Sequence, residues 1–473
     1  MTADLVINGG TIVSPDASYK ASIAIKDGVI LAIGAPDAMP AAKQTLDATG
    51  LHVLPGAIDV HVHFRDPGYP QKEDFASGTA AAAFGGVTCV FDMPNTLPTV
   101  NDAASLAAKH KIASSKAYVD YGLYAVLGED SIANVPALVD GGVIGFKLYM
   151  GNTFGRIASP STGAMLEAFE VVAPTGKRIS LHAETNTIME RREARLRAAG
   201  RTEPIAHLAA RPAVVAIEAV ERAATLAEWT GARIHVLHIS SAAELRPLAE
   251  AKARGVDITG ETCPQYLLLD ETDYDTFKGV VRVNPPVREK PNQQPIWDAL
   301  MDGTIDMIAT DHAPHSIEEK TREDIWTVDC GFPGVETQMP LMLTEINKGR
   351  ATINDYVLWS AESPAKIWGL YPRKGTLTVG SDADIAIVDM SREWTVDDAM
   401  IQSTAKISPW HGRSASALPI HTIVRGRFVM KDRILQEDAR GTGQSVHAIQ
   451  QMPPAEPVNT DATMAAITSV QKA

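Results

Sequence analysis

Strand-like and helical stretches alternate along the middle of this 473-residue chain, and this order constrains the fold more than any other feature. The strand-like stretches are short apolar runs at residues 87–93, 118–126, 143–150, 179–182, 234–239, 257–261 and 305–310. The helical stretches are rich in alanine and lie at residues 76–84, 102–114, 212–230 and 242–254. Repeated strand–helix units with short loops form parallel sheets, and about eight of them close into a barrel. We therefore predict an α/β fold with a (β/α)8 TIM-like barrel.

Both ends of the chain have a different, β-rich pattern. Apolar segments with partial alternation stand between Gly and Asp turns at residues 5–12, 22–33, 375–389 and 420–429. Such segments are typical of short antiparallel strands. We expect residues 1–54 and 373–450 to form one small β-sandwich domain beside a barrel at residues 55–372. The remainder, residues 451–473, is rich in Pro, Ala and Thr and predicts a loosely attached C-terminal extension.

The charge balance and the cysteine content exclude several classes of partner. The chain has 43 basic and 57 acidic residues, a net charge of −14, and no long basic run, which argues against nucleic acid and anionic membranes. No stretch approaches the roughly 18 apolar residues of a membrane span. Three cysteines (Cys89, Cys263 and Cys330) are too few for a disulfide framework. Asp4 stands where a signal peptide would be basic, so the expected location is cytoplasmic.

A His-x-His pair is the first motif that carries chemistry. His61 and His63 lie two residues apart on an expected strand, so both side chains share one face and can bind one metal ion. The alternative is a pair of histidines with ordinary hydrogen-bond partners. Further candidate ligands stand at the ends of later strands, which converge on one mouth of a barrel: Lys147, His182, His238 and Asp311. Four histidines and an aspartate suit zinc.

Lys147 is surrounded by apolar residues in the segment GVIGFKLYM. A buried ammonium group is costly unless it is paired or chemically altered. An ordinary ion pair, or a side chain that reaches solvent, explains this pattern well. Carboxylation of the amine by CO₂ is the other option, because the resulting anion can bridge two metal ions.

Several longer segments then resemble a known family. The segment from Gly56 to Pro98, GAIDVHVHFRDPGYPQKEDFASGTAAAAFGGVTCVFDMPNTLP, is followed in order by FKLYMGNTFG, LHAET, LHISS, ETCPQYL, RVNPPVR, TDHAPHSIEEK and GFPGVET. These segments resemble the cyclic amidohydrolases, the group that contains dihydroorotase, allantoinase and hydantoinase. The resemblance covers about residues 50–345, and these enzymes also carry a small sheet domain.

The resemblance implies a site with two divalent metal ions, for which zinc is the expected metal. One ion would be held by His61, His63 and Asp311, the other by His182 and His238, with an N6-carboxylated Lys147 bridging both. The ions would supply a hydroxide near neutral pH and polarise the scissile carbonyl. Asp311 would take a proton and deliver it to the leaving ring nitrogen. His235 would face the opposite side of its strand and have a structural role.

The resemblance also implies contacts to the substrate. In dihydroorotases a carboxylate on the ring is held by residues that match Arg65, Asn95 and His315 here, and Arg offers a charged fork for it. A loop would cover the ring with Thr153 and Phe154. Backbone groups near Asn284, Pro333 and Gly334 would hold the ring itself. Each clamp residue also has an ordinary explanation, namely a surface ion pair for Arg65, a turn for Asn95 and a helix cap for His315.

These contacts favour dihydroorotase, which reversibly interconverts dihydroorotate and N-carbamoyl-aspartate in pyrimidine biosynthesis. The alternative hypothesis, the rival of dihydroorotase, is a hydantoinase or allantoinase that acts on a five-membered cyclic ureide. Gln265 stands where many dihydroorotases and allantoinases have histidine and some hydantoinase-like sequences have glutamine. The segment SPWHG at residues 408–412 resembles hydantoinases and allantoinases. A third reading is a non-catalytic scaffold, which the complete set of six metal-ligand candidates opposes. The expected partner is a small cyclic ureide, and the resemblance is compatible with a homo-oligomer.

Overall fold

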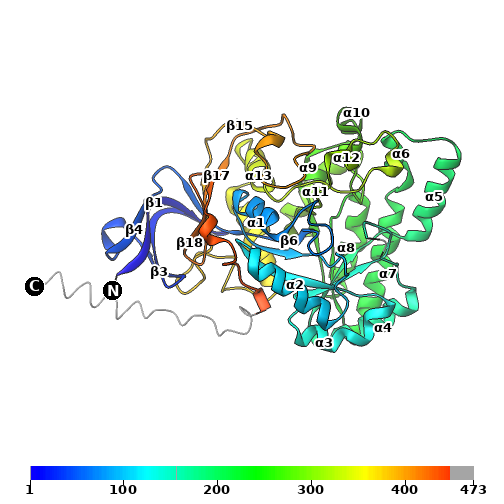
Figure 1. The fold of residues 1–473 in the computed structure, drawn as a ribbon, viewed down its shortest axis with the longest axis horizontal. Coiled ribbons are helices and arrows are strands. Elements are labelled where there is room, and N and C mark those ends of the chain that lie inside the picture. The colour runs from blue at the N-terminus through cyan, green and yellow to red at the C-terminus, as the bar shows by residue number, and fades with distance from the viewer. Residues whose placement is uncertain (1, 156, 448–473) are drawn as a thin grey trace, which may run out of the picture.

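A computed structural model describes residues 2–155 and 157–447. Figure 1 shows a sheet built from both chain ends beside a larger body of strands surrounded by helices. The expected C-terminal extension, residues 451–473, lies outside the described residues. Among the described residues, none of the helices combines the length and the apolarity that a membrane crossing needs.

The larger body is built on eight parallel strands whose neighbours in the sheet are also neighbours in sequence. They are β6 (Ala57–Val62), β7 (Val87–Asp92), β8 (Asp120–Val126), β9 (Gly145–Tyr149), β10 (Arg178–His182), β11 (Arg233–Val236), β12 (Ile258–Thr262) and β13 (Met307–Ile308). The chain after β13 returns to β6, where Val62 bridges His312 in parallel and the His63 N–H donates to the His312 carbonyl at 2.8 Å. The predicted (β/α)8 TIM-like fold is confirmed.

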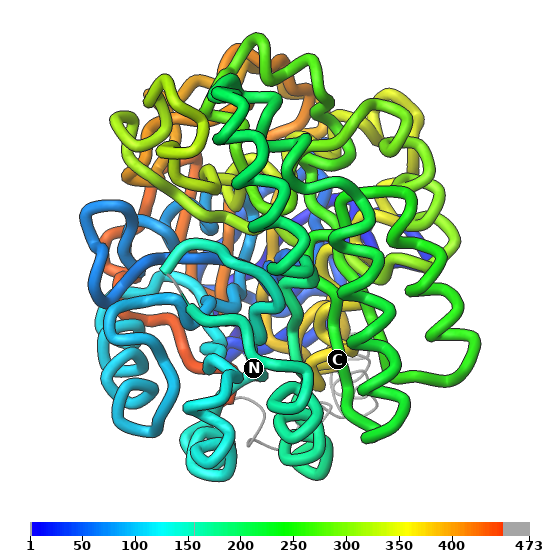
Figure 2. Tube along the Cα trace, turned by 90° about the vertical axis from the view of Figure 1, so that its right-hand side faces the viewer, coloured from blue at the N-terminus to red at the C-terminus, as the bar shows by residue number. Residues whose placement is uncertain are grey.

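Helices α1 to α11 lie between successive barrel strands along the chain, and α12 to α15 follow β13. They are α1 (Phe75–Phe84), α2 (Ala103–Lys116), α3 (Val135–Asp140), α4 (Thr162–Val172), α5 (Asn186–Ala198), α6 (Ile205–Ala210), α7 (Val214–Thr230), α8 (Leu245–Ala253), α9 (Pro264–Leu268), α10 (Asp273–Phe277), α11 (Gln293–Met301), α12 (Ile317–Lys320), α13 (Gln338–Asn347), α14 (Ile353–Val357) and α15 (Ser363–Ile367). Figure 2 shows the green segments that include α7 and α8 on the outside, toward the viewer.

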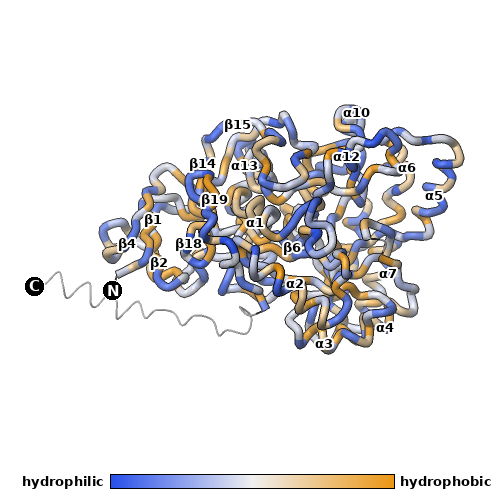
Figure 3. The backbone as a smooth tube through the Cα atoms, viewed as in Figure 1, coloured by the Kyte–Doolittle hydropathy of each residue, from blue (hydrophilic) through white to orange (hydrophobic). Residues whose placement is uncertain are grey.

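The sequence explains where these helices begin and which face they bury. Asp74 and Asp102 cap α1 and α2, each accepting a hydrogen bond from a backbone N–H of the first turn, in reciprocal capping boxes with Ser77 and Ser105. Helix α7 buries an alanine- and valine-rich stripe at the spacing of an amphipathic helix. In α5, by contrast, Met189 is the one buried residue among those described, and Figure 3 shows this helix as mostly hydrophilic.

The two β-rich ends pair into one nine-stranded mixed sheet. Its N-terminal strands are β1 (Ala3–Val13), β2 (Ser18–Lys26), β3 (Val29–Gly34), β4 (Ala42–Asp47) and β5 (His52–Pro55). Its C-terminal strands are β14 (Ile385–Asp389), β17 (Leu418–Val424), β18 (Arg427–Lys431) and β19 (Ile434–Leu435). Antiparallel pairing of β5 with β14 joins the two ends. A further pair, β15 (Trp394–Thr395) and β16 (Ser414–Ala415), stands apart.

Two barrel strands end two or three residues before the end of the predicted run. The run 234–239 gives a strand that ends at Val236, because His238 has a φ of 41° and leaves the extended conformation. The run 305–310 gives only Met307–Ile308, and Asp311 beyond it has a φ of 51°. The residues that leave the extended conformation, His238 and Asp311, are themselves candidate metal ligands.

Candidate active site

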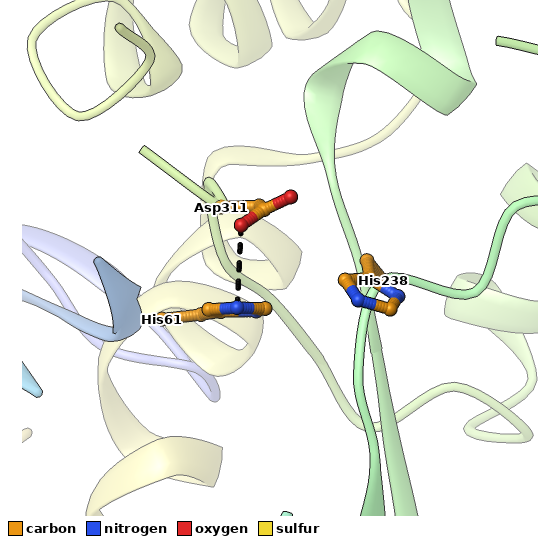
Figure 4. Close-up of side chains that lie close together, drawn as sticks. All are labelled: His61, His238 and Asp311. Carbon is orange, nitrogen blue, oxygen red and sulfur yellow. Dashed lines mark ion pairs between the residues drawn. The ribbon is translucent and has the colours of Figure 1, made fainter. Parts of the chain in front are cut away.

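Side chains from four barrel strands converge at the mouth of the barrel. His61 lies within β6, His182 ends β10, and His238 and Asp311 follow β11 and β13. One ligand atom each from His61, His238 and Asp311 lies within 4.8 Å of the others. Figure 4 shows these three side chains and marks the contact between His61 and Asp311. The structure thus brings together residues that are far apart in the sequence.

The nitrogen and oxygen atoms of this cluster face one another. Nε2 of His61 and Nε2 of His63 lie 3.2 and 3.1 Å from Oδ1 of Asp311. On the other side, Nδ1 of His182 lies 2.9 Å from Nε2 of His238. Burial lowers the pKa of all four histidines, and that of His61, His63 and His238 well below the usual value. Neutral imidazoles are the form that binds metal ions.

The outer nitrogens of three histidines are held by other side chains. Nδ1 of His61 lies 2.7 Å from Oε1 of Glu261. Nδ1 of His63 lies 2.7 Å from Oδ1 of Asn95, and Nε2 of His182 lies 3.0 Å from Oε2 of Glu184. Such contacts fix the tautomer, so the inner nitrogen of each ring keeps its lone pair for a metal ion.

His235 contacts the same acid as His61. Its side chain is fully buried, with Nε2 at 3.1 Å from Oε2 of Glu261 and Nδ1 at 2.8 Å from Oγ1 of Thr259. The expected opposite orientation therefore does not separate His235 from the site, since both histidines meet at Glu261.

Lys147 lies buried in β9, with its Nζ 4.9 Å from the centre of the Tyr149 ring. Burial lowers the pKa of the Lys147 amine to about 7, although Asp311 and Glu261 act in the opposite direction. This shift favours the neutral amine, which is the form that reacts with CO₂.

Arg65 is a buried cation with free donors. Its side chain follows β6 with a φ of 61°, and it is 2% exposed. Among the described residues, neither Nε nor Nη1 has a hydrogen-bond partner. The ring of Phe154 lies over the guanidinium at 4.3 Å. Burial lowers the pKa of Arg65 to about 10, so it still carries its charge at neutral pH.

The other two residues of the expected carboxylate clamp are engaged within the protein. Asn95 faces His63 through Oδ1, and its Nδ2 donates to the carbonyl of Phe154 at 3.4 Å. His315 has Nδ1 at 2.9 Å from Nζ of Lys72 and Nε2 at 3.0 Å from the Cys330 carbonyl. Nε2 of His315 also lies 3.3 Å from Nη2 of Arg65.

The remaining substrate-contact candidates lie around this cluster. Thr153 and Phe154 are half-buried in the loop after β9, and the Phe154 ring packs 5.2 Å from that of His315. Asn284 is buried, with its amide oriented so that the oxygen faces Nη2 of Arg211 at 3.3 Å. Pro333 is buried, and the N–H of Gly334 donates to Nδ1 of His312 at 3.1 Å.

Sequence reasoning missed the acids behind the histidines. Glu184 and Glu261 lie inside the segments LHAET and ETCPQYL, but neither was assigned a role. Arg211 donates to Glu184 and carries no motif of its own among the segments above. A buried acid within a motif next to candidate ligands is a usable signal for Glu184 and Glu261, whereas Arg211 required the structure. The three cysteines are free and take no part in the cluster.

A closed parallel barrel with a buried histidine–aspartate cluster at its mouth defines a class of metal-binding barrel enzymes. The chain belongs to the amidohydrolase family, whose family model matches residues 52–429. This family is metal-dependent, and its cyclic-amide members are hydrolases that act on C–N bonds in cyclic amides.

Two curated relatives are similar to this chain over almost its whole length. The chain is 35% identical over 449 residues to an L-hydantoinase of Paenarthrobacter aurescens, covering 94% of this chain and 98% of the relative. It is 35% identical over 436 residues to an allantoinase of Rubrobacter xylanophilus, covering 90% and 94%.

Solved structures of hydantoinases and dihydropyrimidinases have the same fold as this chain. An L-hydantoinase (dihydropyrimidinase) from Arthrobacter aurescens matches with a TM-score of 0.91 and 34% identity, covering 94% of this chain and 99% of that one. A dihydropyrimidinase from Brevibacillus agri matches with a TM-score of 0.88 and 30% identity, covering 93% and 98%. The cyclic amidohydrolase resemblance is confirmed, but these relatives are not dihydroorotases, so the closer likeness to dihydroorotase is not supported.

Proposed function

We propose that this chain is a metal-dependent hydrolase that opens a cyclic ureide, with the five-membered ring of a hydantoinase or allantoinase substrate as the leading candidate. The observation that carries this proposal is the buried cluster of His61, His238 and Asp311 at the mouth of a barrel. The relatives that share this barrel over nearly their whole length are named for cyclic ureides.

The donor set fits two divalent metal ions. His61, His63 and Asp311 would hold one ion, while His182 and His238 would hold the second. Imidazole nitrogens with a carboxylate are ligands that zinc accepts. Nε2 of His238 faces His182. Its other nitrogen, Nδ1, is buried and has no hydrogen-bond partner among the described residues.

Lys147 would complete the site as an N6-carboxylated side chain between the two ions. The reaction joins the neutral amine to CO₂, forms one N–C bond and releases one proton. The depressed pKa of this buried amine supports the step. The product is an anion, which offers oxygen ligands where an ammonium group would repel the metals.

The protein's own groups supply the proton transfers. When bound, the ions provide a hydroxide near neutral pH and polarise the carbonyl under attack. Burial raises the pKa of Asp311 to about 6, opposed by Lys147 and His182. A carboxylate in this range can accept a proton and return it to the ring nitrogen that leaves.

A panel of rings tests this function. Metal-loaded protein should open hydantoin, dihydrouracil or allantoin, with the release of the open ureide followed by chromatography. Chelation should abolish the reaction and added zinc should restore it. If the metal-loaded protein opens none of these rings and no dihydroorotate, the proposal is wrong.

A second candidate, dihydroorotate, is favoured by Arg65. A guanidinium that is 2% exposed, with two nitrogens unpartnered among the described residues, calls for an anion. A ring that carries a carboxylate would supply this anion. Because Asn95 and His315 are engaged elsewhere, the recognition rests chiefly on Arg65.

Two isomeric substrates distinguish the effect of ring size from the effect of the substrate's charge. Dihydroorotate and 5-carboxymethylhydantoin both carry a carboxylate and both open to N-carbamoyl-aspartate, but they have six and five ring atoms. We expect Arg65→Met to lower kcat/KM for the carboxylated rings by about 30-fold or more, because losing one partner of a buried charge pair costs about 2–5 kcal/mol. Neutral hydantoin should be spared. An equal loss on neutral and charged rings would show that Arg65 has no role in anion recognition.

A further inference from the structure

The loop after β9, whose Phe154 ring lies over the Arg65 guanidinium, is held by the same groups that hold two histidines of the cluster. The covering loop is defined here as residues 151–155, between β9 and α4. One contact path runs from His182 to the start of the loop, and another runs from His63 to Phe154. Neither path involves a substrate.

The first path passes through Arg211, which forms the Arg211 bridge. Oε2 of Glu184 receives hydrogen bonds from Nε2 of His182 at 3.0 Å and from Nη1 of Arg211. Nη2 of the same guanidinium donates to the Asn152 carbonyl at 3.1 Å. Glu184 is fully buried and Arg211 is 8% exposed. One rigid fork therefore joins the partner of His182 to the backbone of the loop.

The second path passes through Asn95, which forms the Asn95 bridge. Its Nδ2 donates to the Phe154 carbonyl at 3.4 Å, so its Oδ1 is the acceptor that faces Nδ1 of His63 at 2.7 Å. His63 therefore carries its proton on Nδ1, and its Nε2 lone pair faces Asp311. By the same reasoning, Glu184 accepts from Nε2 of His182 and leaves the Nδ1 lone pair facing inward.

The loop also lies too close to the Glu184 backbone for a side chain at its first residue. A Cβ added at Gly151 would meet the Glu184 carbonyl oxygen at 2.5 Å. The N–H of Asn152 donates to Oδ1 of Asn186 at 3.0 Å. Both polar backbone groups of Asn152 are thus held by side chains from the connection between β10 and β11, with Asn186 at the start of α5 and Arg211 just after α6.

We propose that Arg211 is a positioning residue that couples the covering loop to the metal-binding histidines. The closed loop and the inward-facing lone pair of His182 stabilise each other through the Arg211 bridge. This coupling rests on the proposed metal role of His182. It is reciprocal, because two linked equilibria must shift each other by the same factor.

Hydrogen–deuterium exchange with and without metal tests the coupling. In the wild-type protein, removal of the metal by chelation should raise deuterium uptake severalfold in the peptide that covers residues 150–155. In Arg211→Met the uptake should be high in both states. Metal retention against a competing chelator, measured by atomic absorption, should weaken by about tenfold, as for the loss of other groups that orient ligands.

Arg192→Met is the matched control. Arg192 also donates to a backbone carbonyl, that of Ala209, but within the described residues it forms no hydrogen bond to Glu184 or to the loop. It should behave like the wild type in both measurements. Arg211→Lys is the second variant if Arg211→Met does not fold, because one ammonium group cannot reproduce the fork. It should show the same loss of coupling.

The outcomes separate this inference from the proposed function. If the wild-type protein binds no divalent metal, the proposed function fails. If it binds metal, but metal protects the loop of the folded Arg211 variant as strongly as that of the wild type, the coupling is wrong and the proposed function stands. If Arg211 has only a structural role, Arg211→Met should raise deuterium uptake by the same amount with and without metal. Metal would then still lower the uptake of the loop, and this result would also overturn the coupling.

Discussion

The buried acid Glu261 holds Nδ1 of His61 and so leaves Nε2 of this ring facing the barrel mouth. Oε1 of Glu261 accepts from the backbone N–H of His238 at 3.3 Å and faces Nδ1 of His61 at 2.7 Å. Its other oxygen faces His235. Burial raises the pKa of Glu261 well above its usual range, so the charged form of this acid has a cost in free energy and is disfavoured without nearby cations. Cations at the barrel mouth would offset that cost, which ties Glu261 to metal binding.

Glu261→Gln should therefore weaken metal binding without removing a ligand. The amide keeps the shape of the acid but loses its charge, and groups that orient ligands typically contribute 10- to 100-fold in metal affinity. We expect retention to fall by about tenfold or more in competition with a chelator, with activity recovered at high zinc.

The control for this change is Glu244→Gln. Glu244 is also buried, but it accepts hydrogen bonds from Ser240 and Ser241 instead of a histidine. It should leave metal retention unchanged. Equal retention in Glu261→Gln and the wild type would show that Glu261 does not support the metal site.

At the scale of elements, helix α1 fixes the turn that carries His63 and Arg65. Gly78 in this helix packs on the ring of Phe64, and an added Cβ would collide with that ring. Phe64 is fully buried, with Phe75 at 5.6 Å and His312 at 5.7 Å between ring centres. Phe64 thus packs against the helix through Gly78 and Phe75, and this contact joins the helix to the end of the strand.

Gly78→Ala should destabilise the protein despite the better helix propensity of alanine. Overpacking a buried contact costs about 1–3 kcal/mol, which outweighs the roughly 1 kcal/mol that alanine gains over glycine in a helix. Gly163→Ala in α4 is the control, because a Cβ there meets nothing within 4 Å. Urea denaturation should show a lower midpoint for the first variant and an equal or higher midpoint for the second. Equal midpoints for Gly78→Ala and the wild type would contradict this packing argument.

How far the sequence predicts these elements depends on the range of the interaction. Apolar runs and alanine-rich stretches predict the barrel strands and many of the helices, because these patterns are local. The strand ends at His238 and Asp311 escape prediction, since their positive φ values depend on tertiary contacts. The contact between His61 and Glu261 joins residues 200 positions apart, which no single sequence pattern reports. The motifs contain the candidate ligands and also the acids Glu184 and Glu261, but they do not show which acid holds which histidine.

At the scale of the whole molecule, buried charges join the barrel to the mixed sheet. Nζ of Lys374 contacts Oδ2 of Asp120 in β8 at 2.6 Å, as well as Asp384 just before β14 and Asp382 at 3.3 Å. Arg425, between β17 and β18, also contacts Asp120. Lys374 is 1% exposed, so three carboxylates share a cation that water does not screen.

Lys374→Met should destabilise the whole protein. Removing one partner from a buried charge network costs about 3–5 kcal/mol. Without Lys374, three buried carboxylates would face only the arginines Arg425 and Arg373 among the contacts described, and Asp384 would lose its ammonium partner. Burial alone would lower the pKa of Lys374, but the three carboxylates raise it well above its usual value of 10.5. The folded pKa exceeds the unfolded one, so this stabilisation is fully present below about pH 10.5 and is lost only as the pH rises further.

The test is the urea midpoint of Lys374→Met at neutral pH, with Lys348→Met as its control. Lys348 pairs with Glu345, but its side chain is 60% exposed, so its removal should change the midpoint little. Because the network lies between the barrel and the sheet, both should unfold in one transition in the wild type. A midpoint for Lys374→Met equal to that of the wild type would show that Lys374 does not contribute to holding the barrel and the mixed sheet together.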